Sequence, residues 1–209
     1  MPKITDERRE ARREQILDAA RACVQEHGLE AVSMEMIIAR SGLSTGAVYG
    51  YFKGKDDIIS AVVTEGTAAM GRQLVPILKN PDPPPLPELI DQLLRTIAEF
   101  GQDKRDGIDR LLAAIHGWSH SQSDAGLKAT TRAAYRGQRE LLADTVRRWQ
   151  EAGTFDPGAD PEAVAQLLQS ILLGFVAQRA LAGDADAPAH VAALEALTRQ
   201  SSATNPGGQ

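Results

Sequence analysis

Apolar residues recur at three- and four-residue spacings along most of the chain, which is the pattern of amphipathic helices. The first helix is predicted over about 6–27, with Thr5 as its N-cap and Gly28 suited to the left-handed residue after its end. Its apolar stripe consists of Ile16, Ala19, Ala20, Cys23 and Val24. The alternation of apolar and polar residues typical of β-strands is nearly absent, so we expect an all-α fold.

Two short helices and a longer one are predicted next. Ser33 is a suitable N-cap for a short helix that Gly42 ends, and Ser44 is the N-cap of a second short helix over about 45–51. The longer helix begins near Asp56. Two short helices joined by a tight turn, with a further helix packed behind them, form a helix-turn-helix, whose second helix enters the DNA major groove.

The rest of the chain predicts a larger helical domain. Pro76 predicts a kink or an early end of the fourth helix, because proline lacks a backbone N–H and clashes with the preceding turn. The segment 80–87, NPDPPPLP, predicts a stiff non-helical connector. Five more helices are predicted. The fifth helix begins near residue 87, the sixth includes 108–115, and the seventh covers about 127–152. The eighth starts after an N-cap at Asp160, and the ninth covers about 189–199. The chain is thus expected to contain about nine helices.

Charge and composition narrow the class of protein. The net charge of −5 argues against a protein that coats nucleic acid over its whole surface, but a local basic patch can still bind DNA, since salt screens charges beyond about 8 Å. Two basic groups are present, one of Lys3, Arg8, Arg9, Arg12 and Arg13, the other of Lys53 and Lys55. Cys23 is the only cysteine, so no intrachain disulfide can form. No secretory signal or membrane span is recognisable, so we expect a cytoplasmic protein that binds no membrane.

The stretch 33–55, SMEMIIARSGLSTGAVYGYFKGK, resembles the DNA-binding domain of the tetracycline-repressor (TetR) family. The residues that match the family pattern are Ile38, Ala39, Gly42, Leu43, Ser44, Gly46, Tyr49, Tyr51, Phe52 and Lys55. Ser41 stands where the family usually has Ala, and Leu43 where it usually has Val. The match covers the first quarter of the chain, and the rest resembles the family in length and helix count. The alternative interpretation of this stretch is a simple helical corner in a bundle.

The resemblance implies a set of DNA-binding residues. Ser33, Ser44, Tyr49, Tyr51 and Lys55 match positions that bind backbone phosphates, and Thr45, Gly46, Ala47 and Gly50 match positions near the base edges. The small residues Thr45, Gly46 and Ala47 let the helix backbone approach the DNA closely. Gly50 stands where many relatives carry a larger side chain, so Thr45 is expected to be the main residue that reads bases.

The helix predicted after Asp160 is apolar on nearly all sides, so it must be covered on both faces. One face is expected to meet the core of the chain and the other a second copy, which agrees with the resemblance, since TetR-family proteins dimerise through their last two helices. The predicted interface residues are Leu168, Leu172, Phe175 and Val176. Two-fold symmetry also suits DNA half-sites roughly 34–36 Å apart. The alternative is a fully buried central helix of a monomer.

A ligand pocket is expected among the helices between residues 87 and 152. Its candidate lining residues are Phe100, His116, Trp118, Arg132 and Tyr135. Each also has a structural interpretation, either as a core side chain or as part of a solvated charged face. His116 and His120 have a spacing that could suit metal ligation, but a third ligand is not evident, so no metal site and no cofactor are predicted.

Together these features predict a ligand-responsive transcriptional repressor that binds a palindromic operator as a homodimer and is released by a small molecule. The expected domains are a DNA-binding domain over 1–54, a ligand-sensing and dimerisation domain over 55–200 and a disordered tail over 201–209. Two alternatives remain, a helical DNA-binding protein that senses no ligand and a helical enzyme. The chain carries no phosphate-binding glycine loop, no G-x-S-x-G and no H-E-x-x-H, so an enzyme is not expected.

Overall fold

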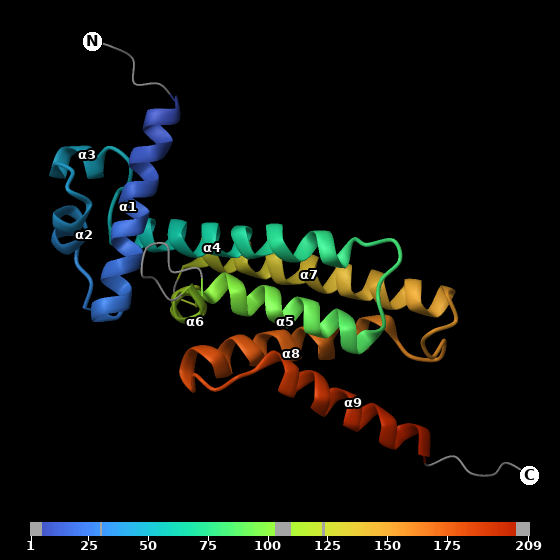
Figure 1. Cartoon of the computed structure of the whole chain (residues 1–209). Coiled ribbons are helices and arrows are strands. Elements are labelled where there is room, and N and C mark those ends of the chain that lie inside the picture. The colour runs from blue at the N-terminus through green and yellow to red at the C-terminus, as the bar shows by residue number, and fades with distance from the viewer. Residues whose placement is uncertain (1–5, 30, 103–109, 123, 204–209) are drawn as a thin grey trace, which may run out of the picture. The chain divides into compact units, whose positions relative to one another are not determined.

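The structure is a computed structural model that describes residues 6–29, 31–102, 110–122 and 124–203. Within these ranges it contains nine helices and no strand (Figure 1), which confirms the predicted all-α fold. The helices are α1 (Asp6–His27), α2 (Met34–Ser41), α3 (Thr45–Tyr49), α4 (Lys55–Leu78), α5 (Leu86–Gln102), α6 (Arg110–His120), α7 (Ala125–Glu151), α8 (Pro161–Leu181) and α9 (Ala187–Ala203).

Most helix boundaries follow from local capping, and some differ from the predictions. Helix α3 ends at Tyr49, two residues before the predicted end. Helix α4 continues past Pro76 to Leu78, so the predicted early end is wrong. Pro76 is exposed, which lets water bond the helix carbonyl that its missing N–H leaves without a partner. Helix α9 extends into the stretch predicted as a disordered tail, and 204–209 lie outside the described residues, as does Ile108.

The chain divides into two compact units. The first unit comprises residues 1–69 and 101–133, and the second comprises 70–100 and 134–209. Helices α4, α5 and α7 therefore contribute residues to both units. The functional boundary predicted after residue 54 stays a prediction.

The first unit is built on a core shared by α1, α2, α3 and the start of α4. Its buried residues are Ile16, Leu17, Ala19, Ala20, Cys23, Val24, Val32, Ile37, Val48, Phe52, Ile58 and Ile59. Helix α6 packs against α4 without space to spare, because a Cβ atom added at Gly117 would lie 2.7 Å from Cγ2 of Val63. The predicted stripe of α1 is confirmed, since all five of its residues are buried.

The second unit is held together by apolar burial and by a few polar contacts between its helices. Leu89, Ile90, Leu93, Leu94 and Ile97 form the buried side of α5. The last carbonyl of α4, that of Leu78, accepts hydrogen bonds from Thr145 Oγ1 at 3.3 Å and from Arg148 Nη2 at 2.7 Å, so α7 anchors the end of α4. Trp149 Nε1 donates to the carbonyl of Pro84 at 3.0 Å, which fixes the proline-rich connector on α7.

Helix α8 is long and apolar enough, by length and composition, to cross a membrane. One face of α8 is buried within the chain, and this face carries Gln169, whose side-chain oxygen and nitrogen are both hydrogen-bonded. Gln169 Oε1 accepts from Arg139 Nε at 3.0 Å and Nη2 at 2.8 Å, and its Nε2 donates to the carbonyl of Tyr135 at 2.8 Å and to Oε1 of Gln138 at 3.1 Å. A buried polar group with this many partners pins α8 to α7 at one register.

Candidate nucleic-acid interface

The α2–α3 turn is fixed by capping residues at both ends of α2 and at the start of α3. Ser33 Oγ accepts from the backbone N–H of Met36 at 3.3 Å, which caps the start of α2. Gly42 follows α2 with a φ of 67°, a left-handed conformation that side chains disfavour. The buried Ser41 hydroxyl donates to the carbonyl of Ile38 at 2.9 Å and accepts from the N–H of Leu43 at 3.3 Å. The direction in which α3 leaves α2 is thereby set.

Helix α3 has only one and a half turns, so packing rather than intrinsic propensity must hold it. Ser44 Oγ caps it by accepting from the N–H of Ala47 at 3.3 Å. Val48 is fully buried, and Phe52, which follows the helix, is nearly so. With these two side chains in the core, the first turn of α3 presents Thr45 and Gly46 to solvent. This exposed turn is the part of a recognition helix that faces the bases.

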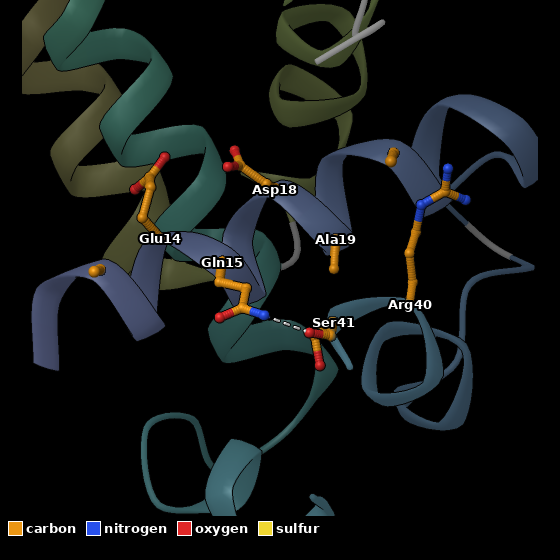
Figure 2. Close-up of a pocket in the computed structure, with 8 residues that line it drawn as sticks. Glu14, Gln15, Asp18, Ala19, Arg40 and Ser41 are labelled. Carbon is orange, nitrogen blue, oxygen red and sulfur yellow. Dashed lines mark hydrogen bonds between the residues drawn. The ribbon is translucent and has the colours of Figure 1, made fainter. Parts of the chain in front are cut away.

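Helix α1 braces the turn from behind through residues distant in sequence. Gln15 Nε2 donates to the carbonyl of Ser41 at 2.7 Å (Figure 2). Arg40 on α2 donates through both terminal nitrogens to the Glu26 carboxylate of α1, each at 2.6 Å. The hydrogen bond from Arg40 holds the pKa of Glu26 below its ordinary value. These contacts fix α2 on α1, and the sequence offered no signal for the pair Gln15 and Ser41.

An open groove of about 570 Å³ lies between α1 and α2 beside this brace (Figure 2). It is lined by Ala11, Glu14, Gln15, Asp18, Ala19, Ala22, Arg40 and Ser41. Two of its side chains, Glu14 and Asp18, are carboxylates, which repel phosphates. The groove is therefore unsuited to the DNA backbone.

An ion-pair network links α1 to α4 within the first unit. Arg21 donates to Glu14 at 2.7 Å, to Glu65 of α4 at 3.2 Å and to Asp18, and Arg13 also pairs with Glu65. Burial lowers the pKa of Arg21, but the neighbouring carboxylates outweigh it and the net direction is upward, so the guanidinium stays charged. The network links α1 to the middle of α4.

The predicted DNA-binding residues gather on and around α3. Thr45, Gly46, Tyr49 and Gly50 are exposed, as is the Ser44 cap. Tyr49 has 51% of its surface exposed, although it follows the buried Val48 directly, so its ring is free to contact a partner. Ser33, Ala47, Tyr51 and Lys55 are half-buried. Their individual roles in DNA binding stay predictions.

The predicted ligand-binding residues lie on α5, α6 and α7. Phe100, Trp118 and Tyr135 are half-buried, and Arg132 is exposed. The side chain of His116 lies outside those that the structure describes. Because these residues are divided between the two units, their assignment to one pocket stays a prediction.

The four predicted interface residues on α8 face the interior of the chain itself. Leu168, Leu172, Phe175 and Val176 are all buried without any partner chain. The large apolar residues of α8 that are exposed are Leu167 and Leu181, at 63% and 70%. The structure covers one face of α8, and a cover for its other face stays a prediction. The apolar pattern could not tell the inner face from the outer one.

Comparison with known proteins places this geometry in a family. Residues 16–62 match the family model described as bacterial regulatory proteins of the tetR family, and residues 88–201 match that of the BetI-type transcriptional repressor C-terminal domain. The chain belongs to the TetR family. The predicted resemblance is thus confirmed, and the TetR family is one of transcriptional regulators rather than of enzymes.

Relatives of known type agree with this assignment. The chain is 28% identical to the HTH-type transcriptional repressor Rv1474c of Mycobacterium tuberculosis over 151 residues, which is 70% of this chain and 77% of the relative. It is 28% identical to the HTH-type transcriptional regulator BetI of Burkholderia ambifaria over 187 residues, or 88% of each. The solved complex of SmeT with triclosan aligns with a TM-score of 0.66 and 28% identity, over 88% of this chain and 91% of that one.

Proposed function

We propose that this TetR-family chain is a ligand-responsive transcriptional repressor that acts in the cytoplasm, binds a palindromic operator as a homodimer and is released by a small molecule. The observation that carries the proposal is the exposed first turn of α3, held by the buried Val48 and Phe52 and capped by Ser44. A capped, rigid helix whose first turn lacks bulky side chains suits entry into the major groove.

Phosphate contacts on both sides of α3 are proposed to orient it. Ser33, Ser44, Tyr49, Tyr51 and Lys55 are assigned to backbone phosphates, and Thr45, Gly46, Ala47 and Gly50 to the neighbourhood of the bases. A side chain at Gly46 would meet no protein atom within 4 Å, so the space beside this glycine is open to a DNA duplex. A Cβ atom at Gly50 would lie 3.2 Å from the carbonyl of Ala47, which disfavours a larger residue there. Thr45 is therefore assigned as the main residue that reads a base.

The homodimer is proposed to form through the exposed stripe of α8. Leu167, Gly174 and Leu181 are spaced seven residues apart, which places them on one side of the helix. No protein atom lies within 4 Å of a Cβ atom built at Gly174, so a second helix has room to approach there. Leu197 of α9 is 68% exposed and adds a further apolar side chain to the surface that we assign to the dimer.

A small-molecule effector is proposed because the relative SmeT has been solved in complex with triclosan. Phe100, Trp118, Tyr135, Arg132 and His116 are the candidate contacts. A ligand that binds the DNA-free conformation more tightly is expected to weaken operator binding about five- to 150-fold, which corresponds to a coupling of about 1–3 kcal/mol.

The test is displacement of the protein from a duplex selected out of a random-sequence library. A fluorescent duplex bound by the full-length chain is titrated with a diverse collection of small molecules, and the anisotropy is followed at fixed salt. An active compound should lose its effect in Tyr135→Ala, while that variant keeps its affinity for DNA. Tight duplex binding that no compound alters would instead favour a DNA-binding protein that senses no ligand.

A further inference from the structure

The cations on α1 to α4 of the first unit fall into two groups. Arg13, Arg21 and Arg40 are each engaged by carboxylates within the chain. Among the residues that the structure describes, a second group has no ion pair: Arg8, Arg9, Arg12, Lys53 and Lys55. These free cations lie at the start of α1 and at the corner between α3 and α4. A free cation on a DNA-binding domain is available to a phosphate.

Arg9 lies on the side of α1 that faces the rest of the first unit. It precedes Arg13 by four residues and the buried Ile16 by seven, so the three share one face of the helix. Arg9 itself is exposed, because the core ends before it. Arg9 therefore lies on the helix face that carries the buried residues of α1, but beyond the end of the core.

Arg13 connects this face to the α3–α4 corner. The guanidinium carbon of Arg13 lies 5.5 Å from the centre of the Phe52 ring, and Phe52 stands between Tyr51 and Lys53 in the chain. The Arg13 guanidinium stacks on Phe52 and forms ion pairs with Glu10 and Glu65. Arg9 lies about 6 Å from Arg13 along the helix axis, toward the N-terminus, and within the described residues it forms no ion pair. Arg9 is thus about one helical turn from Arg13, and Lys53 directly follows Phe52, the residue that Arg13 contacts.

We propose that Arg9 binds a backbone phosphate of the same duplex that α3 enters, and so extends the row of phosphate contacts from the α3–α4 corner onto α1. The proposal rests on the proposed function, since it requires that α3 binds DNA. The planar guanidinium suits phosphate, because it can donate two parallel hydrogen bonds to it. The contact positions the protein on the duplex and carries no base preference.

Nearby carboxylates bear on the strength of this contact. Glu10 forms an ion pair with Arg13, with 3.6 Å between Glu10 Oε1 and Arg13 Nη1. Asp6 precedes Arg9 by three residues, yet within the described part of the chain no ion pair joins them. Asp6 lies in the first turn of α1, where a carboxylate is stabilised by the free backbone N–H groups. Arg9 is therefore left for a ligand outside the chain.

Arg8 provides a matched control. It carries the same charge, is also exposed and lies on the same helix, but it is rotated by about 100° from Arg9. The affinity of the full-length chain, Arg9→Ala and Arg8→Ala is measured by anisotropy over a range of salt, on the selected duplex and on a random-sequence duplex of equal length. The thermal unfolding of the three proteins is compared to verify that each is folded.

Arg9→Ala should weaken binding to both duplexes about five- to tenfold. It should also reduce the slope of log affinity against log salt by about 1.8, because each protomer of the dimer loses one phosphate contact and each contact contributes about 0.9. Arg8→Ala should keep the affinity and the slope of the unsubstituted chain. The inference is overturned if Arg9→Ala binds like the unsubstituted chain, or if the two variants lose affinity equally. Failure of the unsubstituted chain to bind any selected duplex would overturn the proposed function itself, which is a different result.

Discussion

Gly42 is the residue on which the geometry of the α2–α3 turn depends. Its φ of 67° strains any other residue, whereas Gly46 lies in α3 with no atom near a built Cβ. Gly42→Ala should lower the free energy of unfolding by about 1 kcal/mol. Gly46→Ala should keep or raise stability and weaken DNA binding, because its methyl group stands where the duplex approaches. Thermal unfolding and anisotropy on both variants separate the two effects, and equal stability losses would contradict this account.

Glu26 should make the stability of the DNA-binding domain depend on pH. Its folded-state pKa lies below the ordinary value of 4.5, so the ionised carboxylate stabilises the fold above that value, and this contribution is lost as the pH falls through the lowered pKa. Glu26→Gln should therefore be less stable than the unsubstituted chain at neutral pH, and the difference should vanish in acid. Urea unfolding at a series of pH values measures it, and a difference independent of pH would argue against the Arg40 ion pair.

At the residue scale, the sequence predicted those features that depend only on residues nearby in the chain. The caps Ser33 and Ser44 and the left-handed Gly42 act within four residues of their own positions, so local pattern identified them. The contact of Gln15 with the carbonyl of Ser41 joins positions 26 residues apart and depends on how α1 packs, so no local pattern could reveal it.

At the element scale, helix positions followed from apolar periodicity, but the identity of the inner face did not. Helix α8 illustrates the limit, because it is apolar on nearly all sides and its one fully buried polar residue, Gln169, is held by Arg139 of another helix. Burial of such a group depends on a partner that spacing along α8 does not indicate. The interface residues predicted from sequence therefore lie on the buried face of α8, whereas the exposed stripe on its other face begins at Leu167.

The contact of α6 with α4 gives an element-scale prediction. A methyl group at Gly117 would lie 2.7 Å from Cγ2 and 2.9 Å from Cγ1 of Val63, and these branched carbons have little freedom to move. Gly117→Ala should lower the free energy of unfolding by about 1–3 kcal/mol through overpacking. Val63→Ala in the same chain should restore most of the loss, because it removes both clashing carbons. Denaturant unfolding of the two single variants and the double variant measures the coupling, and additive losses would refute the contact.

At the scale of the whole molecule, the proposed function requires two copies of the chain. Leu167→Glu places a charge on the exposed α8 stripe while leaving the protomer core untouched. The variant should be folded but monomeric in sedimentation equilibrium, and its operator affinity should fall at least about a hundredfold, since the two half-sites are then bound independently. Gln166→Glu, an exposed change at the adjacent position, is the control. If the Leu167→Glu chain is still dimeric, the dimer interface lies on another surface.

The most direct test of the central claim, that α3 makes this chain a DNA-binding repressor, is the affinity of the full-length chain and of Tyr49→Ala for a duplex selected from a random-sequence library, measured by anisotropy at several salt concentrations. Tyr49 is half exposed, so the substitution leaves the core intact. The account predicts tight, salt-dependent binding by the unsubstituted chain and at least about a tenfold loss in Tyr49→Ala at an unchanged unfolding temperature. Equal affinities for the two proteins, or no enrichment of any duplex by the unsubstituted chain, would contradict it.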